Sequence, residues 1–508
     1  MYPQISPNSA SVALSAENAE IIDQLVKIID FAEGLTILFA RCNVPILRQA
    51  LAAEAIRHLA AKDITVVVVE WAENMFGLRD HLRQKLSPAI TSEGRLVVFV
   101  YGLEQSIPSN DPYPPILAEL NMGRELFHRD APYPIVFWLP DYALTALARG
   151  ALDFWAWRSG VFEFETESIY REQALQLYAR QDANWLAVNN MTAEQKRRRR
   201  RVLENLLADY ESLPIDTPTL SKRAEILFTL GQFNQVLADY KAAHRCYQQS
   251  MEISEKLANR SQVGNTLHQI GTVYLMEEQY QQARTQYQQS LAVAQEVGNR
   301  SLQASALQAL GYVHYLQKEY QEAQSYYEQS RAIAQQIGDQ SVEASTLYKL
   351  GGVQFALRKY ALAYIYYEQA LMLSQQVGGG VGIGQTLYQL GALSQAQGQY
   401  EQARTHYEQA RNIFQKLGAR SGIAYSLALI GLLFEQEGDL TQAVAMLAQA
   451  LVLFEQLGTS EQETIRRVLT RLQAQMGQEA FMAAWQAAFS PKAAPPPPIP
   501  RVAQMTLS

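Results

Sequence analysis

The residue types best suited to phosphate chemistry lie in one short stretch of the N-terminal half, residues 39–48. A phosphate-binding loop after an apolar run needs glycines, whose backbone N–H groups wrap the phosphates, and a Lys-Ser or Lys-Thr pair. This stretch has no glycine and no such pair, and Pro45 stands where an N–H group is required. Arg41 and Arg48 supply positive charge without the backbone cradle, so this stretch lacks the parts of a phosphate-binding loop.

An acidic residue after a later apolar run is the second candidate for this chemistry. A carboxylate that holds magnesium would stand at the end of the run at residues 96–101, but Tyr101 and Gly102 occupy that place. The first acid is Glu104. It is either a remnant of a catalytic carboxylate or a solvated loop residue, and the second interpretation is the simpler.

Metal and nucleophile chemistry have no motif in this sequence. His58, His81 and His128 are scattered without the spacing of metal ligands, and Cys42 and Cys246 lie far apart in the chain. There is no GxSxG sequence and no pair of catalytic carboxylates. We therefore predict no metal, no cofactor and no enzymatic activity.

A basic run, Lys196–Arg201, lies inside a probable helix over residues 192–213. Successive residues of a helix point about 100° apart, so the run encircles the helix and forms no single stripe. It fits a solvated helix with salt bridges, a contact for an acidic partner, or a nucleic-acid contact. The net charge of −7 argues against a general nucleic-acid binder, and we predict no nucleic-acid partner.

Apolar runs that alternate with helical patterns must position these residues. We expect strands over residues 35–40, 64–70, 96–101, 134–139 and 161–164, and helices over residues 45–61, 78–86, 115–128 and 141–148. Continuous apolar strands alternating with helices indicate a parallel sheet covered on both faces. The predicted fold class is an α/β domain over residues 21–166, after a disordered N-terminus over residues 1–20.

The C-terminal half repeats with a period of 40 residues. Each of six copies has a glycine and, twelve residues later, an alanine; a tyrosine follows four residues further on in all but the last copy. The glycines are Gly231, Gly271, Gly311, Gly351, Gly391 and Gly431, and the alanines are Ala243, Ala283, Ala323, Ala363, Ala403 and Ala443. A second glycine, such as Gly298 or Gly338, closes most copies.

Each of these positions has a physical role in a helical hairpin. The first glycine and the alanine let two helices cross closely, and the tyrosine is a wedge one turn beyond the alanine. The closing glycine can end the second helix in a left-handed conformation. We predict an all-α superhelical solenoid over residues 220–459, two capping helices over residues 460–490 and a proline-rich tail over residues 491–508. The tail is either solvated or a ligand for SH3-type domains.

The repeat pattern resembles the tetratricopeptide repeat, in the longer form of kinesin light chain-like and signalling-ATPase-associated arrays. The strand and helix order of the N-terminal half, followed by helices and such an array, resembles the STAND class of signal-transduction P-loop ATPases. Because the phosphate-binding residues are missing, this resemblance implies a degenerate, inactive STAND-type domain. The alternative is a STAND-type ATP-dependent signalling switch.

The tetratricopeptide resemblance implies a concave groove lined by the first helix of each repeat. Aromatic and amide side chains at the groove positions suit an extended peptide or an inserted helix. These positions are Asn265, His268, Gln308, Tyr312, Tyr315, Tyr348, Phe355, Tyr388 and Tyr425. We therefore predict a non-catalytic adaptor, scaffold or signalling sensor that binds a protein or peptide; the identity of the partner and the oligomeric state stay open.

The segment between the two halves, residues 167–219, reads as helices over residues 169–180 and 192–213. Leu203, Leu206, Leu207 and Tyr210 recur at helical spacing and must be buried, so we expect a semi-rigid helical linker. The start of the chain has no basic patch followed by an apolar core, and its apolar runs are shorter than the ~20 residues that span a bilayer. We expect a cytoplasmic protein with no membrane partner.

Overall fold

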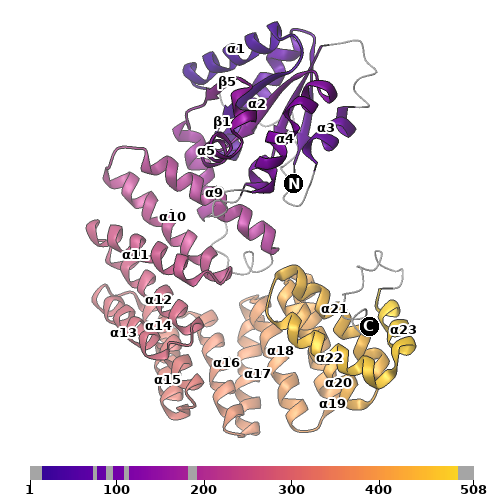
Figure 1. Ribbon diagram of the computed structural model, residues 1–508. Helices are drawn as coiled ribbons and strands as arrows, with labels where there is room; N and C mark the ends of the chain where they lie inside the picture. Colours follow the sequence, from indigo (N-terminus) through magenta and orange to yellow (C-terminus); the bar gives the residue numbers. More distant parts are fainter. Residues whose placement is uncertain (1–13, 72–76, 87–94, 108–113, 181–190, 490–508) are drawn as a thin grey trace. The chain divides into compact units, whose positions relative to one another are not determined.

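The computed structural model of the protein describes residues 14–71, 77–86, 95–107, 114–180 and 191–489. The chain divides into two compact units (Figure 1). The N-terminal unit consists of residues up to 183 together with residues 198–226, and the second unit of residues 184–197 and of residue 227 onward. The proline-rich tail, predicted over residues 491–508, lies outside the described residues.

The N-terminal unit is built on a parallel sheet of five described strands, in the order β2-β3-β4-β1-β5. The strands are β1 (Thr36–Arg41), β2 (Ile64–Glu70), β3 (Arg95–Tyr101), β4 (Pro134–Leu139) and β5 (Arg158–Glu163). The predicted parallel α/β fold is thus confirmed. The largest shift is at β5, which begins three residues earlier than expected because Arg158 pairs with Ile37 and Gly160 with Leu38, the register skipping Ser159.

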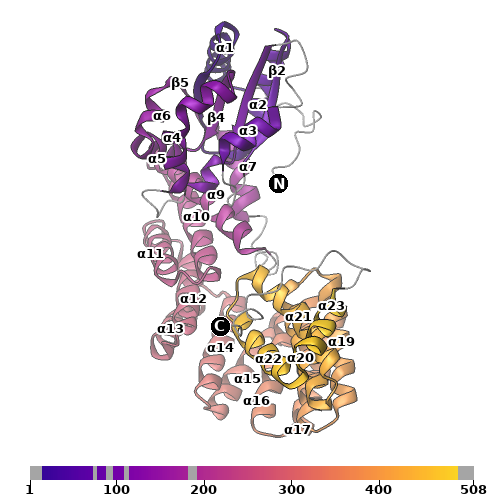
Figure 2. The ribbon, with the colours of Figure 1, turned by 45° about the vertical axis from the view of Figure 1, so that its right-hand side comes forward.

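Helices cover both faces of this sheet, as the continuous apolar strands require. On one face, Phe39, Val98 and Phe137 form a buried cluster with side chains of α3, α4 and α5. On the other face, α1 and α2 pack together and bury Leu25 and Leu51 (Figure 2). The helices are α1 (Ala16–Phe31), α2 (Pro45–Ala60), α3 (Leu78–Leu86), α4 (Pro115–Asp130), α5 (Asp141–Gly150), α6 (Leu152–Ala156) and α7 (Ser168–Leu175).

Helix α1 begins earlier than the sequence indicated. The Ser15 hydroxyl caps it by accepting the Asn18 backbone N–H at 3.2 Å. The buried Asn18 amide donates to the Glu165 carbonyl at 3.0 Å and to the Glu167 carboxylate at 2.8 Å. The expected disorder over residues 1–20 is therefore wrong for residues 16–20, because distant hydrogen bonds order a polar helix start.

The segment after the sheet was predicted as a helical linker, but most of it belongs to the N-terminal unit. In chain order it contains α7, a π-helical turn (Gln176–Arg180), α9 (Ala193–Glu211) and the start of α10 (Thr217–Val236). Leu203, Leu206 and Tyr210 of α9 are buried, as their spacing predicted. Asp209 accepts a hydrogen bond from the Asn43 amide at 3.0 Å, next to the end of β1. The apolar stripe thus lies in the unit that contains the sheet.

The second unit is a run of helical hairpins, which confirms the predicted solenoid. The even-numbered helices from α10 to α20 are called first helices here, and the odd-numbered ones from α11 to α21 second helices. They are α11 (Tyr240–Lys256), α12 (Arg260–Met276), α13 (Tyr280–Glu296), α14 (Arg300–Leu316), α15 (Tyr320–Ile337), α16 (Gln340–Ala356), α17 (Tyr360–Gln376), α18 (Gly380–Ala396), α19 (Tyr400–Lys416), α20 (Arg420–Glu437) and α21 (Leu440–Leu457). Helices α22 (Glu461–Met476) and α23 (Gln478–Ala488) follow, where capping helices were expected.

The repeated glycine, alanine and tyrosine have the roles that their spacing predicted. A Cβ atom on Gly351 would lie 2.6 Å from the ring of Tyr367, so only glycine admits this fully buried wedge. Ala363, one turn before the tyrosine, is also fully buried. Gly338 ends α15 at φ +69°, and the Asp339 side chain caps α16.

The first helices lie on the inner side of the array. Successive first helices, from α12 to α20, contact each other, whereas in the described residues no two successive second helices approach to the same extent. Closer spacing on one side curves a solenoid toward that side. The surface formed by the exposed side chains of α12, α14, α16, α18 and α20 is called the first-helix face below.

One helix in the described residues, α21, is long and apolar enough to cross a membrane. Leu447, Leu451 and Phe454 of this helix are buried against α22 and α23 in the C-terminal core of the array. Its apolar composition is accounted for by this packing.

Candidate functional site

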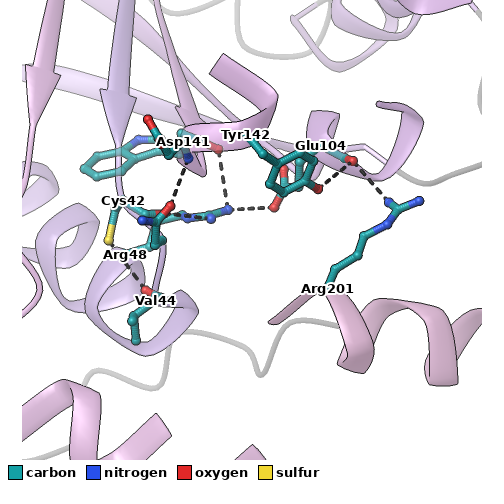
Figure 3. Close-up of polar contacts among 9 residues, drawn as sticks. Cys42, Val44, Arg48, Glu104, Asp141, Tyr142 and Arg201 are labelled. Atoms are coloured by element: carbon teal, nitrogen blue, oxygen red, sulfur yellow. Dashed lines mark hydrogen bonds and ion pairs between the residues drawn. The ribbon is translucent and has the colours of Figure 1, made fainter. Parts of the chain in front are cut away.

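The carboxyl ends of the five strands meet at one edge of the N-terminal sheet. Strand β1 lies between β4 and β5, so the order of the strands reverses beside it. Ligands of open α/β sheets bind at this kind of position, outside the carboxyl ends of the strands. Figure 3 shows the side chains that gather there from the β1–α2 loop, α2, the turn after β3, α5 and α9.

Arg48 fills the space behind the β1–α2 loop. Its side chain is 2% exposed, and its guanidinium donates to the Cys42 carbonyl at 2.9 Å and to Glu104 Oε1 at 2.7 Å. A third contact joins it to the Trp138 carbonyl at 3.5 Å, at the end of β4. The loop therefore turns the Cys42 carbonyl oxygen inward, toward a cation of the protein itself. A phosphate cradle would need N–H groups at this place.

Glu104 is held from two sides. Its carboxylate pairs with Arg48, and its side chain is only 12% exposed. Its backbone carbonyl accepts hydrogen bonds from the Tyr142 hydroxyl and from the Arg201 guanidinium, both at 3.2 Å. The interpretation of Glu104 as a solvated loop residue is wrong. The turn forms because Gly102 adopts φ +84° so close to Trp71 that a Cβ atom would lie 2.2 Å from its carbonyl oxygen.

The rim of this edge is also internally paired. Arg41, the last residue of β1, bridges Asp141 at 3.1 Å and Glu163 at 3.0 Å. The Asn43 side chain accepts the Asp141 backbone N–H at 2.9 Å. The positive charges that the sequence offered for phosphate binding thus neutralise carboxylates of the same chain.

Among the described residues at this edge, Cys42 and Tyr142 are the remaining groups that could act as nucleophiles, and both are held protonated by burial. Burial raises the pKa of the Cys42 thiol to about 12, so it stays protonated at neutral pH. Burial also raises the pKa of the Tyr142 hydroxyl above its usual range. Throughout the residues that the structure describes, no group of three or more His, Cys, Asp or Glu side chains could hold a metal ion.

The basic run in α9 is partly used for packing. The Arg199 guanidinium donates to the carbonyls of Leu177 at 2.8 Å and Tyr178 at 3.0 Å. Arg200 lies 3.5 Å from Glu204, and Arg201 donates to the Glu104 carbonyl. The interpretation of a helix with salt bridges fits Arg200, whereas Arg199 and Arg201 donate to backbone carbonyls, which none of the three interpretations included.

The first-helix face presents a cluster of aromatic rings around one lysine. Tyr312 is 40% exposed, and its ring lies parallel to that of Tyr315 with centroids 6.2 Å apart. The Lys349 ammonium lies 5.5 Å from the centre of the Tyr312 ring, within cation–π distance. Lys349 has no ion pair within the described ranges, and burial lowers the pKa of its amine.

Tyr348 and Tyr388 extend this cluster along the face. Each ring packs against the wedge tyrosine of its own repeat, Tyr367 at 6.1 Å and Tyr407 at 5.7 Å. The Tyr348 hydroxyl accepts a hydrogen bond from Gln389 at 3.2 Å. Both rings are therefore held in position while remaining partly exposed.

Two predicted groove residues are tied to neighbouring helices. The Gln308 amide donates to the Thr346 hydroxyl at 2.6 Å and accepts from the Ser345 hydroxyl at 3.1 Å. Phe355 packs against Tyr360, with ring centroids 5.9 Å apart. These side chains serve the contacts between helices.

The other predicted groove residues lie away from the tyrosine cluster. His268 packs on Tyr287, and burial lowers the pKa of its imidazole to about 4. The Tyr425 hydroxyl donates a hydrogen bond to the Glu461 carboxylate of the first capping helix, α22. Asn265 is half-buried on α12. The structure therefore brings together Tyr312, Tyr315, Tyr348 and Tyr388 and leaves these three outside the cluster.

Lys349 is the residue of the cluster that the sequence reasoning missed. The repeats give a signal that could have found it, because the equivalent positions are Gln269, Ala309, Gln389 and Leu429. Within that set, Lys349 alone carries a charge.

The helical array matches a known repeat family. Residues 222–296, 262–336, 302–376, 342–416 and 382–456 each match the profile of a family described as Tetratricopeptide repeat. The matches overlap and run through the whole array. Residues 222–456 are therefore tetratricopeptide repeats, as the spacing of glycine, alanine and tyrosine predicted.

Several solved structures are similar to the chain. Aspartyl phosphate phosphatase F from Bacillus subtilis is 11% identical over 87% of this chain and 95% of its own, with a TM-score of 0.43. The Rap conjugation gene regulator of plasmid pLS20, solved with the Phr* peptide, is 14% identical over 64% and 95%, with a TM-score of 0.43. A STAND protein with a tetratricopeptide repeat sensor from Pyrococcus horikoshii is 10% identical over 92% and 95%, with a TM-score of 0.38.

At these identities and TM-scores, the similarities assign no activity and no partner to this chain. None of the curated proteins compared with the sequence matches it. The STAND-type character of the N-terminal unit stays a prediction.

Proposed function

We propose that this chain is a non-catalytic adaptor or signalling scaffold that binds a peptide segment of a partner protein on the first-helix face. The observation that carries the proposal is the cluster of Tyr312, Tyr315, Tyr348 and Lys349. Tetratricopeptide repeats on residues 222–456 support a role in protein interaction. We further propose that the protein acts in the cytoplasm and uses no cofactor.

The chemistry of the cluster favours one kind of peptide. Tyrosine rings held by their neighbours offer apolar surface and a hydroxyl at little cost in conformational entropy. Lys349 adds one positive charge. Burial makes the charged form of this amine unfavourable unless an anion pairs with it. An extended peptide or helix with apolar side chains and one acidic residue fits both features.

Peptide selection on the full-length chain tests this proposal. Displayed random peptides are selected on the immobilised protein, and the affinity of the enriched peptides is measured by fluorescence anisotropy. Replacing Tyr312, Tyr348 and Tyr388 by alanine should weaken binding by at least about tenfold, since interface hot spots cost ~2 kcal/mol or more. Lys349→Met should weaken binding of acidic peptides more than that of neutral ones.

Tyr364→Ala is the matched control, because this tyrosine is exposed on a second helix. It should leave peptide affinity unchanged. Selected peptides that bind the triple variant as tightly as the wild type would move the binding surface away from the first-helix face.

A further inference from the structure

The second helix α17 has an exposed apolar surface. Leu362 is 46% exposed, Tyr364 and Ile365 are 50% exposed, and Met372 is 53% exposed. Leu362, Ile365 and Met372 lie along one side of the helix, and Tyr364 borders them. These four residues are called the α17 patch below.

The repeats themselves show that the array does not need this patch. The equivalent residues of α13, α15 and α19 are polar or small. They are Gln282, Glu322 and Gln402 in place of Leu362; Arg284, Gln324 and Arg404 in place of Tyr364; Thr285, Ser325 and Thr405 in place of Ile365; and Ala292, Ala332 and Asn412 in place of Met372. The buried positions of these helices are the same in kind, for example Ala323 and Ala363, or Tyr327 and Tyr367. The apolar residues of α17 therefore serve something other than packing within the array.

The size of the α17 patch suits the centre of an interface. Four half-exposed large side chains present roughly 300–400 Å² of apolar surface, a size at which patches on single proteins are often functional. A stable interface buries about 800 Å² on each partner, with an apolar centre and a polar rim. The glutamines and charged residues of α15 and α19 supply such a rim.

We propose that two copies of this chain associate through the α17 patch, with the two helices antiparallel about a two-fold axis at Ile365. The charges around the patch carry this choice of partner. Arg358 and Lys359 are exposed just before α17, and Glu368, the helix's one charged residue, is exposed one turn after Ile365. A two-fold axis at Ile365 sets Glu368 of each copy level with Leu362 of the other, about one turn from the basic end. The charge pattern is thus complementary to itself.

Sedimentation equilibrium of the full-length chain, from about 1 to about 100 µM, tests the proposal. The wild type should show a monomer–dimer equilibrium in this range. The variant L362E/Y364Q/I365S/M372A copies the residues of α15, a helix that the same array already contains. It should be folded by circular dichroism and weaken dimerisation by at least about tenfold. Gln282→Glu with Thr285→Ser copies α15 onto α13, a helix outside the patch and its rim, and should leave the dimer unchanged.

A charge reversal tests the antiparallel arrangement separately. Glu368→Lys should weaken the dimer, and adding Arg358→Glu and Lys359→Glu to it should restore the association. A wild type that stays monomeric over the whole range would overturn the proposal, and so would an α15-copied variant that dimerises normally. Failure of the combined reversal to restore the dimer would overturn the two-fold pairing through α17.

Discussion

The carboxyl edge of the N-terminal sheet and the first-helix face of the array both gather charged and aromatic side chains, but they use them differently. At the sheet edge, the Arg48 guanidinium is bonded to Glu104 and to two backbone carbonyls. On the first-helix face, Lys349 contacts the Tyr312 ring and has no ion pair in the described residues. One region has satisfied its charge internally, and the other has left a charge for something else to satisfy.

This difference supports the proposal that the array, and not the sheet edge, binds a ligand. A ligand at the sheet edge would have to break a buried ion pair, and each separated partner would then be a buried charge without compensation. A peptide on the first-helix face breaks no ion pair and gives Lys349 a counter-charge. The comparison therefore favours the array as the binding unit and a structural role for the sheet edge.

The largest expected effect comes from breaking the pair at the sheet edge. Arg48→Met leaves the Glu104 carboxylate mostly buried without its partner and should destabilise the N-terminal unit by about 3–5 kcal/mol. The measurement is urea unfolding of the full-length chain followed by tryptophan fluorescence, since most tryptophans, such as Trp71 and Trp138, lie in this unit.

The double variant Arg48→Met/Glu104→Leu is the control for this prediction. It removes both charges, so it should recover most of the lost stability. If the single variant is as stable as the wild type, the sheet edge is not closed by this pair, and the contrast with the first-helix face fails.

A smaller effect on stability should come from His268. This residue tests whether a position on the first-helix face has a structural role instead of a binding role. Its Nδ1 atom is buried without a hydrogen bond in the described residues, and burial lowers its pKa to about 4. The ordinary pKa is about 6.5, so between these values the unfolded chain binds the proton and the folded chain does not. This contribution to stability is present above pH ~6.5 and is lost as the pH falls toward 4, by up to roughly 3 kcal/mol.

His268→Gln tests this, because Gln308 occupies the same register in the next repeat. Unfolding by urea is followed by circular dichroism at about pH 7 and about pH 4.5. The variant should lose less stability than the wild type between the two values. An equal loss in both proteins would show that other groups cause the acid sensitivity of the array and that His268 is not a buried structural residue.

The sequence predicted those features that depend on spacing along the chain. The six glycines, with their alanines and tyrosines, predicted the hairpins because each repeat contacts only its neighbours. The apolar runs predicted the parallel sheet. Glu104 was misjudged because its partner, Arg48, is 56 residues away along the chain. The polar start of α1 was missed because Asn18 forms hydrogen bonds with Glu165 and Glu167, which follow it by 147 and 149 positions.

The tyrosine cluster could be predicted only in part for a similar reason. Tyr312 and Tyr348 were placed on the correct face by their register, but which rings remain open depends on contacts between repeats. Phe355 and Gln308 are engaged with neighbouring helices, and no spacing rule distinguishes them from Tyr312. Lys349 was identifiable only by comparing the repeats with one another.

The smallest expected effect is a null result that addresses the alternative of an ATP-driven switch. We expect no binding of magnesium-ATP to the full-length chain by calorimetry at millimolar nucleotide. The β1–α2 loop has no glycine, and the carbonyl oxygens of Cys42 and Trp138 accept hydrogen bonds from Arg48. Arg41 forms ion pairs with Asp141 and Glu163. A phosphate would meet carbonyl oxygens and carboxylates where it needs N–H donors and free cations.

Unfolding provides a second readout, since a ligand at 100 times its Kd would add ~2.7 kcal/mol to the stability of the folded chain. Saturable binding, a matching rise in stability, and loss of both in Glu104→Gln would together show that the sheet edge is a working nucleotide site, and would reverse the roles assigned to the two regions.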